Sequence, residues 1–187
     1  MEQSGGFKMI YRLDENYFVR SLNENDLSGT YSSWFENQKV CRYNSHGKFF
    51  PTTKELLNYY QSINKNKELI VWAICHEKDG HIGNISLQDI SFIDRRAQFA
   101  ILLGEEKHWR CGVSSLAINK LLEHGFQKLH LEKIYCGTAA NNEGMIATAK
   151  KIGMREEGRR IQHLWLEGKW EDVIEFAILR KEWLPGK

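Results

Sequence analysis

The chain has 187 residues, of which 42% are hydrophobic and 12% aromatic, and its formal net charge is +2. This composition predicts one folded domain with a sizeable core, excludes a disordered chain, and argues against a nucleic-acid-binding protein, which carries a clear basic excess. No apolar run reaches the roughly 18 residues of a membrane span and no apolar signal segment opens the chain, so we expect a cytoplasmic protein without membrane or nucleic-acid partners.

The N-terminal part of the chain predicts one strand and two helices after a polar start. Residues 1–9 are polar and glycine-containing, and we expect them to be disordered or foreign to the natural chain. Residues 17–22 have the pattern of a strand. Asn23 or Asn25 is placed to cap a helix over about residues 26–38. A Thr-Thr-Lys-Glu capping box then begins a second helix.

The middle of the chain predicts an antiparallel meander followed by a helical crossover. Residues 69–75 and 81–87 have the pattern of two strands joined by an Asp-Gly turn. Residues 99–103 are continuously apolar, as expected of a strand buried on both faces. An amphipathic helix over residues 112–129 leads to a strand at 133–138, which a right-handed crossover would place parallel to the preceding strand.

The C-terminal part predicts one more helix and a long hairpin. Asn141 or Asn142 caps the helix, Gly153 ends it, and residues 155–166 and 170–179 form the hairpin strands. The whole chain therefore predicts a single α/β (α+β) domain, with a mixed, largely antiparallel sheet of seven strands and four main helices.

The loop at residues 104–111 lies between the apolar strand and the central helix. A strand that feeds a helix through a glycine-containing loop directs unpaired N–H groups and the positive end of the helix dipole at one point, which suits a phosphate group. The loop matches neither a Walker A sequence nor a dinucleotide fingerprint. By pattern alone, a packing unit without a ligand is the more common case.

The cysteines and histidines do not form a recognisable metal or redox motif. The four cysteines are far apart in the sequence, which favours a reducing compartment: Cys41, Cys75, Cys111 and Cys136. Cys111 with His108 has the residue types of a nucleophilic pair, although a small loop residue is the more common role. His76 and His81 flank a turn at the wrong spacing for a zinc helix, so no metal site is expected.

A set of local motifs follows a fixed order along the chain. They are Trp34 with Arg42-Tyr43, His81-Ile82-Gly83-Asn84-Ile85, Trp109-Arg110-Cys111-Gly112-Val113-Ser114, Asn142, Lys151-Ile152-Gly153-Met154 with Glu157-Gly158, Gly168-Lys169-Trp170-Glu171-Asp172-Val173, and Leu179-Arg180-Lys181-Glu182-Trp183. In this order they resemble the GNAT superfamily of acyl-CoA-dependent N-acetyltransferases, in its RimJ/RimL-type branch. The resemblance covers residues 17–183 and implies a sheet whose fourth and fifth strands splay apart.

The resemblance implies acetyl-CoA as co-substrate and no metal. It places the pyrophosphate against a loop with these residues: Trp109, Arg110, Cys111, Gly112, Val113 and Ser114, with Ser115 beside them. It places the pantetheine arm along main chain of Ile101, Leu102 and Leu103, with Asn142 touching the arm. Arg110 and Ser114 stand where the family usually has smaller residues, and Arg110 adds a guanidinium that suits a phosphate.

The catalytic end departs from the family pattern. Ala149 stands where related enzymes often have a tyrosine that protonates the thiolate, and Gln98 replaces a common carboxylate. Met145 and Leu164 stand where ribosomal-protein-modifying members tend to have Ser and Glu. We expect direct transfer to an amine in a ternary complex, with a water held by Asn142 as the proton donor. The candidate base is His163 or a chain of waters, and the more common role of such a histidine is an exposed strand residue.

The expected acceptor is a primary amine of a small molecule, with a leaning towards an amino sugar or nucleotide-linked amino sugar. Candidate acceptor-binding residues, which have an equally common role as core or strand surface, are Tyr43, Asn44, Asn84, Ser86, Phe99 and Trp165. The alternatives are a protein N-terminal acetyltransferase and a non-catalytic acyl-CoA-binding module. A homodimer formed through the hairpin at residues 165–170 is a further possibility.

Overall fold

The computed structural model describes residues 10–44, 48, 52–63 and 65–183, so the predicted polar start at 1–9 lies outside the described residues. The strands are β1 (Ile10–Arg12), β2 (Tyr17–Ser21), β3 (Ile70–His76), β4 (Gly80–Ser91), β5 (Arg96–Leu103), β6 (Lys133–Ala139), β7 (Arg155–Leu166) and β8 (Lys169–Leu179). The helices are η1 (Glu24–Ser28), α1 (Tyr31–Trp34), α2 (Thr53–Ile63), η3 (Glu106–His108), α3 (Val113–Gln127) and α4 (Glu143–Lys151). No helix in these ranges has the length and apolar character to cross a bilayer.

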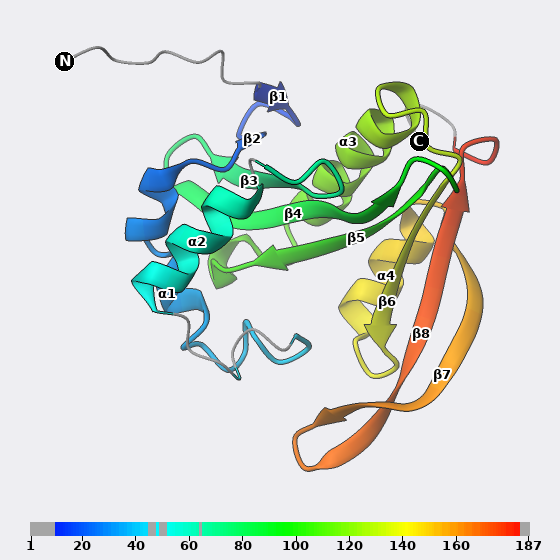
Figure 1. Ribbon diagram of the computed structural model, residues 1–187. Helices are drawn as coiled ribbons and strands as arrows, with labels where there is room; N and C mark the ends of the chain where they lie inside the picture. Colours follow the sequence, from blue (N-terminus) through cyan, green and yellow to red (C-terminus); the bar gives the residue numbers. More distant parts are fainter. Residues whose placement is uncertain (1–9, 45–47, 49–51, 64, 184–187) are drawn as a thin grey trace.

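All described strands join one mixed sheet in the order β1-β2-β3-β4-β5-β6-β8-β7 (Figure 1). Every neighbouring pair is antiparallel except β5 and β6, which are parallel, so the predicted meander, crossover and hairpin are confirmed. The sheet has eight strands rather than the predicted seven. The extra strand, β1, has three residues, which is too short to show a pattern, and it pairs with β2 across a turn in which the Asp14 carboxylate accepts two backbone N–H groups.

The sheet opens at its centre, between β5 and β6. Their ladder contains only the pairs Arg96–Lys133, Ala97–Ile134 and Gln98–Tyr135, after which both strands continue without pairing to each other. Figure 1 shows β5 and β6 diverging from this point, as the predicted splay requires. The parted strands leave main-chain groups on their facing edges without a partner among the described strands.

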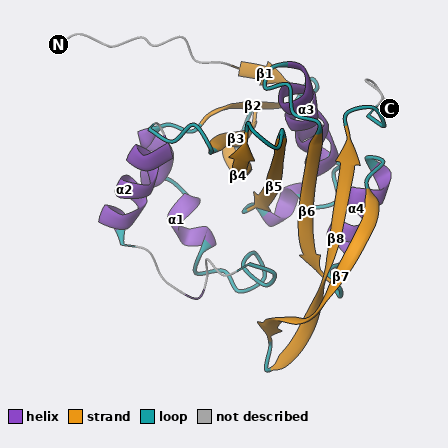
Figure 2. Ribbon diagram, turned by 45° about the vertical axis from the view of Figure 1, so that its right-hand side comes forward, coloured by secondary structure: helices purple, strands orange, loops and turns teal. Residues whose placement is uncertain are grey.

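Different helices cover the two faces of the sheet, α1 and α2 on one face and α3 and α4 on the other (Figure 2). α3 packs on the face that carries Ile85, Leu87 and Phe99, and it contributes a fully buried stripe to the main core: Ala117, Ile118, Leu121, Leu122 and Phe126. On the other face α2 packs on alternate residues of β3, and α1 forms a second cluster with Leu102. α4 keeps its predicted form, with Asn142 as N-cap, Ala149 buried and Gly153 in the left-handed conformation at its end.

The predicted helix over residues 26–38 is wrong in its extent. Asn23 caps a short 3₁₀ helix, η1, through a capping box with Asp26, and Gly29 then ends it in a non-helical conformation. α1 follows as a separate turn, so the helix is broken where glycine lowers helix propensity. The predicted apolar face is nevertheless buried: Leu27, Tyr31, Trp34 and Phe35. The second helix begins with the predicted capping box between Thr52 and Glu55.

A buried ion pair holds η1 against β2. The Arg20 guanidinium donates two hydrogen bonds of 2.7 Å to the Asp26 carboxylate, which is 7% exposed. Burial acts to raise the pKa of Asp26, but hydrogen bonds from Arg20 and the Asn23 amide outweigh it and hold the pKa below its usual range. The pair therefore stabilises the fold only while Asp26 is ionised.

We expect Asp26→Asn to lower the free energy of unfolding by about 3 kcal/mol, because it leaves the half-buried Arg20 without its counter-charge. Since the pKa of Asp26 is lower in the folded chain, its contribution is complete above the unfolded pKa of about 3.9 and is lost as pH falls through the folded pKa. Urea unfolding of the two proteins at several pH values measures this difference, which should shrink below about pH 4. The exposed Asp89→Asn change is the control and should have little effect.

Candidate active site

The N-terminus of α3 has unsatisfied backbone donors. Its N-cap is Gly112, with φ of 83°, which has no side chain to cap the helix, and its first turn contains no acidic residue. The amides of Val113, Ser114 and Ser115 therefore have no intrahelical partner and lie at the positive end of the helix dipole. This arrangement suits an anion such as a diphosphate.

Arg110, in the loop just before α3, has an unusual backbone conformation. Its φ is 64°, a left-handed value that is uncommon for a residue other than glycine, and its side chain is exposed. Such backbone strain persists only where surrounding contacts hold it. The guanidinium, Gly112 and the first turn of α3 thus give the segment both the charge and the backbone shape of an anion site.

Two tryptophans hold the loop against β5. The Trp109 indole N–H donates to the Leu103 carbonyl at 3.0 Å, and the Trp34 indole N–H donates to the Glu105 carboxylate at 3.0 Å. The Trp34 ring lies so close to Gly104 that a Cβ atom there would be 2.0 Å from it. The end of β5 is therefore fixed from α1 on one side and from the loop on the other.

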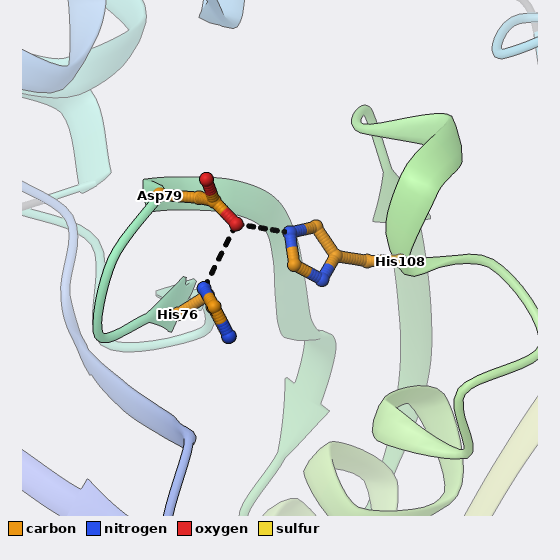
Figure 3. Close-up of side chains that lie close together, drawn as sticks. All are labelled: His76, Asp79 and His108. Atoms are coloured by element: carbon orange, nitrogen blue, oxygen red, sulfur yellow. Dashed lines mark hydrogen bonds and ion pairs between the residues drawn. The ribbon is translucent and has the colours of Figure 1, made fainter.

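A cluster of His76, Asp79 and His108 joins η3 to the turn between β3 and β4 (Figure 3). Asp79 Oδ2 lies 2.9 Å from His76 Nδ1 and 3.1 Å from His108 Nε2, and Lys107 Nζ lies 2.7 Å from Asp79 Oδ1. Burial and the neighbouring His76 lower the pKa of His108, so the neutral ring donates from Nε2 while the Tyr17 hydroxyl lies 3.0 Å from Nδ1. This network fixes the segment just before the proposed anion site, which consists of Arg110, Gly112 and the first turn of α3.

The same cluster brings together metal-ligating residue types in a combination that the sequence did not predict. His81 does not join His76; it contacts Asn84 and Asp26 instead, while His108 comes from a distant part of the chain. The three ligand-type atoms lie within 4.8 Å of one another, a spacing that a metal ion would also tolerate. Lys107 pairs with the Asp79 carboxylate and His108 donates to it, so Asp79 has a cation and a donor without a metal ion. His76 Nδ1 is buried and contacts the same carboxylate without forming a hydrogen bond. Cys111 is an exposed free thiol.

The part of β5 that is predicted to hold the pantetheine arm is less buried than the sequence predicted. Ile101, Leu102 and Leu103 are half-buried and Ala100 is exposed, because β6 does not pair with this part of β5. Alternate main-chain N–H and C=O groups of the strand consequently face the gap. An extended chain of amides could pair with them as a missing strand would.

Asn142 lies at the far side of the gap, at the start of α4. Its Oδ1 accepts from the Met145 amide at 3.2 Å, and its Nδ2 donates to the Thr138 hydroxyl at 3.1 Å. This accounts for Asn142 as a helix cap. One N–H of its side-chain amide is left over from these two contacts.

The β7–β8 hairpin carries the candidates His163 and Trp165, and both are exposed. His163 lies in an irregular stretch of β7 with Nε2 3.3 Å from Arg160 Nη1. Trp165 stacks edge-on against Trp170 at 5.1 Å between ring centroids and is 50% exposed. The structure therefore places His163 beside a guanidinium rather than in a closed site.

The acceptor candidates lie on two different faces of the sheet. The Tyr43 hydroxyl donates to the Asn141 carbonyl, so the chain after α1 reaches the loop after β6, and Asn44 donates to the Val40 carbonyl. Asn84 and Ser86 point to the face that α1 and α2 cover. Phe99 lies in the main core on the α3 face, 2% exposed, and is not brought together with them.

Sequence reasoning missed a cavity at the point where β5 and β6 part. It has a volume of about 280 Å³ and is lined by Arg96, Lys133, Tyr135, Glu157, Glu175 and Phe176. Tyr135 belongs to the last pair of the β5–β6 ladder, and Glu175 pairs with Gly137 just beyond it. Only the register of four strands brings these residues together, so no local signal could have found them.

Comparison with known proteins agrees with this geometry. The family described as Acetyltransferase (GNAT) domain matches residues 17–155. A spermidine N(1)-acetyltransferase of Vibrio cholerae is 29% identical over 167 residues, which cover 89% of this chain and 88% of the relative. A putative ribosomal N-acetyltransferase of Bacillus subtilis is 29% identical over 106 residues, 56% of this chain and 57% of the relative.

Solved structures give the same fold. The crystal structure of spermidine N-acetyltransferase from Vibrio cholerae in complex with CoA and spermine has a TM-score of 0.82 at 23% identity, and covers 90% of this chain and 98% of that chain. A structure of the same Vibrio enzyme is described as dodecameric, with a TM-score of 0.79 at 22% identity, covering 92% of this chain and 98% of that chain.

Proposed function

This chain belongs to the GNAT family of acetyltransferases, and we propose that the amine it acetylates is the primary amine of a small molecule. It is an acyltransferase that takes acetyl from acetyl-CoA, and we propose that it does so without a metal ion. The observation that carries the proposal is the combination of an uncapped α3 N-terminus with the gap between β5 and β6. The first accepts a diphosphate and the second accepts an extended, amide-containing arm.

Acetyl-CoA supplies a thioester carbonyl, and the chain must position an amine against it. An alkyl ammonium has a pKa of about 10, so it must lose a proton before it attacks. We propose His163 as the group that receives this proton, directly or through water; it is linked through Arg160 to the edge of the cavity. We propose that the free N–H of Asn142 holds the water that protonates the leaving thiolate, and that β5 amides facing the gap stabilise the oxyanion.

The proposed acceptor class is an amino sugar or a nucleotide-linked amino sugar. The second candidate is a polyamine, which the spermidine-acetylating relatives favour. A protein N-terminus is a third, because a putative ribosomal N-acetyltransferase is among the relatives and the RimJ/RimL-type resemblance stays a prediction. A binding module without turnover is the remaining alternative.

A thiol-release assay with acetyl-CoA and a panel of amines tests the proposal. Amino sugars, nucleotide-linked amino sugars, polyamines, aminoglycosides and peptide N-termini form the panel. Release above the amine-free rate with an amino sugar supports it, and release with peptides alone would contradict it. Binding of acetyl-CoA with no release for any amine would favour the module without turnover.

Three further predictions concern the chain as a whole. One sheet includes every described strand, which supports a single domain.

The outer edge of β7 and the exposed side chains Ile161, Trp165 and Trp170 offer a surface on which a second copy could pair. We therefore propose a homodimer, to be measured by light scattering. The four free cysteines support a cytoplasmic location.

A further inference from the structure

The cavity beside the gap lies where an acceptor would meet the end of the bound arm. From the anion site, β5 runs back from Leu103 to Phe99 over about 13 Å, at 3.3 Å per residue, and reaches the last β5–β6 pair, Gln98–Tyr135. Tyr135 lines the cavity on the face opposite the Ile134 and Cys136 side chains, which lie in the main core. The cavity thus opens at the inner end of the gap.

Glu175 has a carboxylate oxygen at this cavity that forms an ion pair but accepts no hydrogen bond from the described part of the chain. Its Oε1 is buried and accepts no hydrogen bond from any group among the residues that the structure describes. Arg160 Nη2 lies 2.8 Å from the same oxygen, which makes an ion pair without the alignment of a hydrogen bond. A Cβ atom on Gly137 would lie 2.8 Å from this oxygen, so the carboxylate lies over β6 just beyond the last pair. An ammonium would satisfy it.

Each cation at the cavity has a carboxylate partner, but the partner of Arg96 does not line the cavity. Lys133 pairs with Glu157 inside it, whereas Arg96 pairs with Asp94, at 3.5 Å, which is more than half exposed. Arg96 Nη1 also donates to the Tyr135 hydroxyl at 3.1 Å, which holds the guanidinium over the cavity. With Arg160 at the edge, three cations and two carboxylates surround the space.

We propose that this cavity is the acceptor subsite, in which Glu175 binds the ammonium of the acceptor and Arg96 binds an anionic group of the same molecule. The proposal rests on the acetyltransferase function and narrows its acceptor to an amine that also carries a phosphate or carboxylate. A polycation such as a polyamine would bring further positive charge against Arg96, Lys133 and Arg160, and like charges at short range cost binding energy.

Thiol release by the full chain, with saturating acetyl-CoA, compares glucosamine, glucosamine 6-phosphate, UDP-glucosamine and spermidine. A phosphorylated acceptor should have a kcat/KM about 10-fold or more above that of glucosamine, and spermidine should be the poorest. Arg96→Gln should raise KM for phosphorylated acceptors about 10-fold and raise KM for glucosamine by a much smaller factor. Glu175→Gln should lower kcat/KM for every amine about 10- to 100-fold while KM for acetyl-CoA stays constant.

Arg95→Gln is the control, because Arg95 precedes Arg96 but donates to the His130 carbonyl and pairs with Glu132, outside the cavity. The inference is overturned, with the acetyltransferase proposal intact, if spermidine or glucosamine is the preferred acceptor, or if Arg96→Gln affects all amines alike. No release with any amine overturns both. Unchanged circular dichroism and acetyl-CoA binding in the two variants exclude a folding defect as the cause.

Discussion

Ser114→Asp is expected to weaken acetyl-CoA binding by about 100-fold while leaving the protein as stable as before. The change puts a carboxylate in the first turn of α3, where the diphosphate would lie, and two like charges about 4 Å apart in a partly buried site repel by a few kcal/mol. The same carboxylate favours the helix, since a negative charge near an N-terminus interacts well with the helix dipole. Titration calorimetry and thermal unfolding measure the two effects separately.

Two control variants make this result specific. Ser114→Ala removes the hydroxyl without adding charge and should change the dissociation constant of acetyl-CoA by less than about threefold. Thr53→Asp adds a carboxylate to the first turn of α2, a helix without a proposed ligand, and should leave binding unchanged. If Ser114→Asp bound acetyl-CoA as tightly as the unaltered chain, the diphosphate would have to lie elsewhere.

Gly104→Ala is expected to lower the free energy of unfolding by about 3 kcal/mol, because the added methyl group has no space. Its Cβ would lie 2.0 to 2.4 Å from three ring atoms of Trp34, whose side chain is 2% exposed and holds the cluster around α1. Relief requires Trp34 to leave Glu105, and the end of β5 would move with it. Denaturant unfolding measures the loss of stability, and acetyl-CoA binding should weaken at the same time.

Gly158→Ala is the matched control for this change. Its Cβ would meet no atom within 4 Å, so the unfolding free energy should change by less than about 0.5 kcal/mol. Equal effects of the two substitutions would mean that the Trp34–Gly104 contact is not what holds the end of β5.

The elements with strong local signals were predictable from the sequence. The α3 stripe, the capping box of α2 and the Asn142 cap of α4 each depend on residues a few positions apart, and the structure confirms them. The predicted extent of the first helix was wrong because its apolar face continues across Gly29, where the backbone is not helical. The buried residues do recur at helical spacing, but they belong to two separate short helices, η1 and α1.

The proposed site was predictable only where its residues are continuous in the sequence. The loop before α3 is a local segment, and the structure gives it the expected uncapped helix start. Phe99 was expected among the acceptor residues, but the register with Leu87 places it on the core face. Glu175 and Arg96 were overlooked because they meet only through the pairing of β5, β6, β8 and β7, and long-range register leaves no pattern in a single sequence.

The central claim is that the first amides of α3 bind the diphosphate of acetyl-CoA. The most direct measurement is a titration of the ¹⁵N-labelled chain with acetyl-CoA, followed through backbone amide shifts. We expect the amides of residues 112–115 to show the largest shifts and to saturate with the dissociation constant found by calorimetry. Saturating binding that leaves these amides unmoved, or no binding at all, would contradict it.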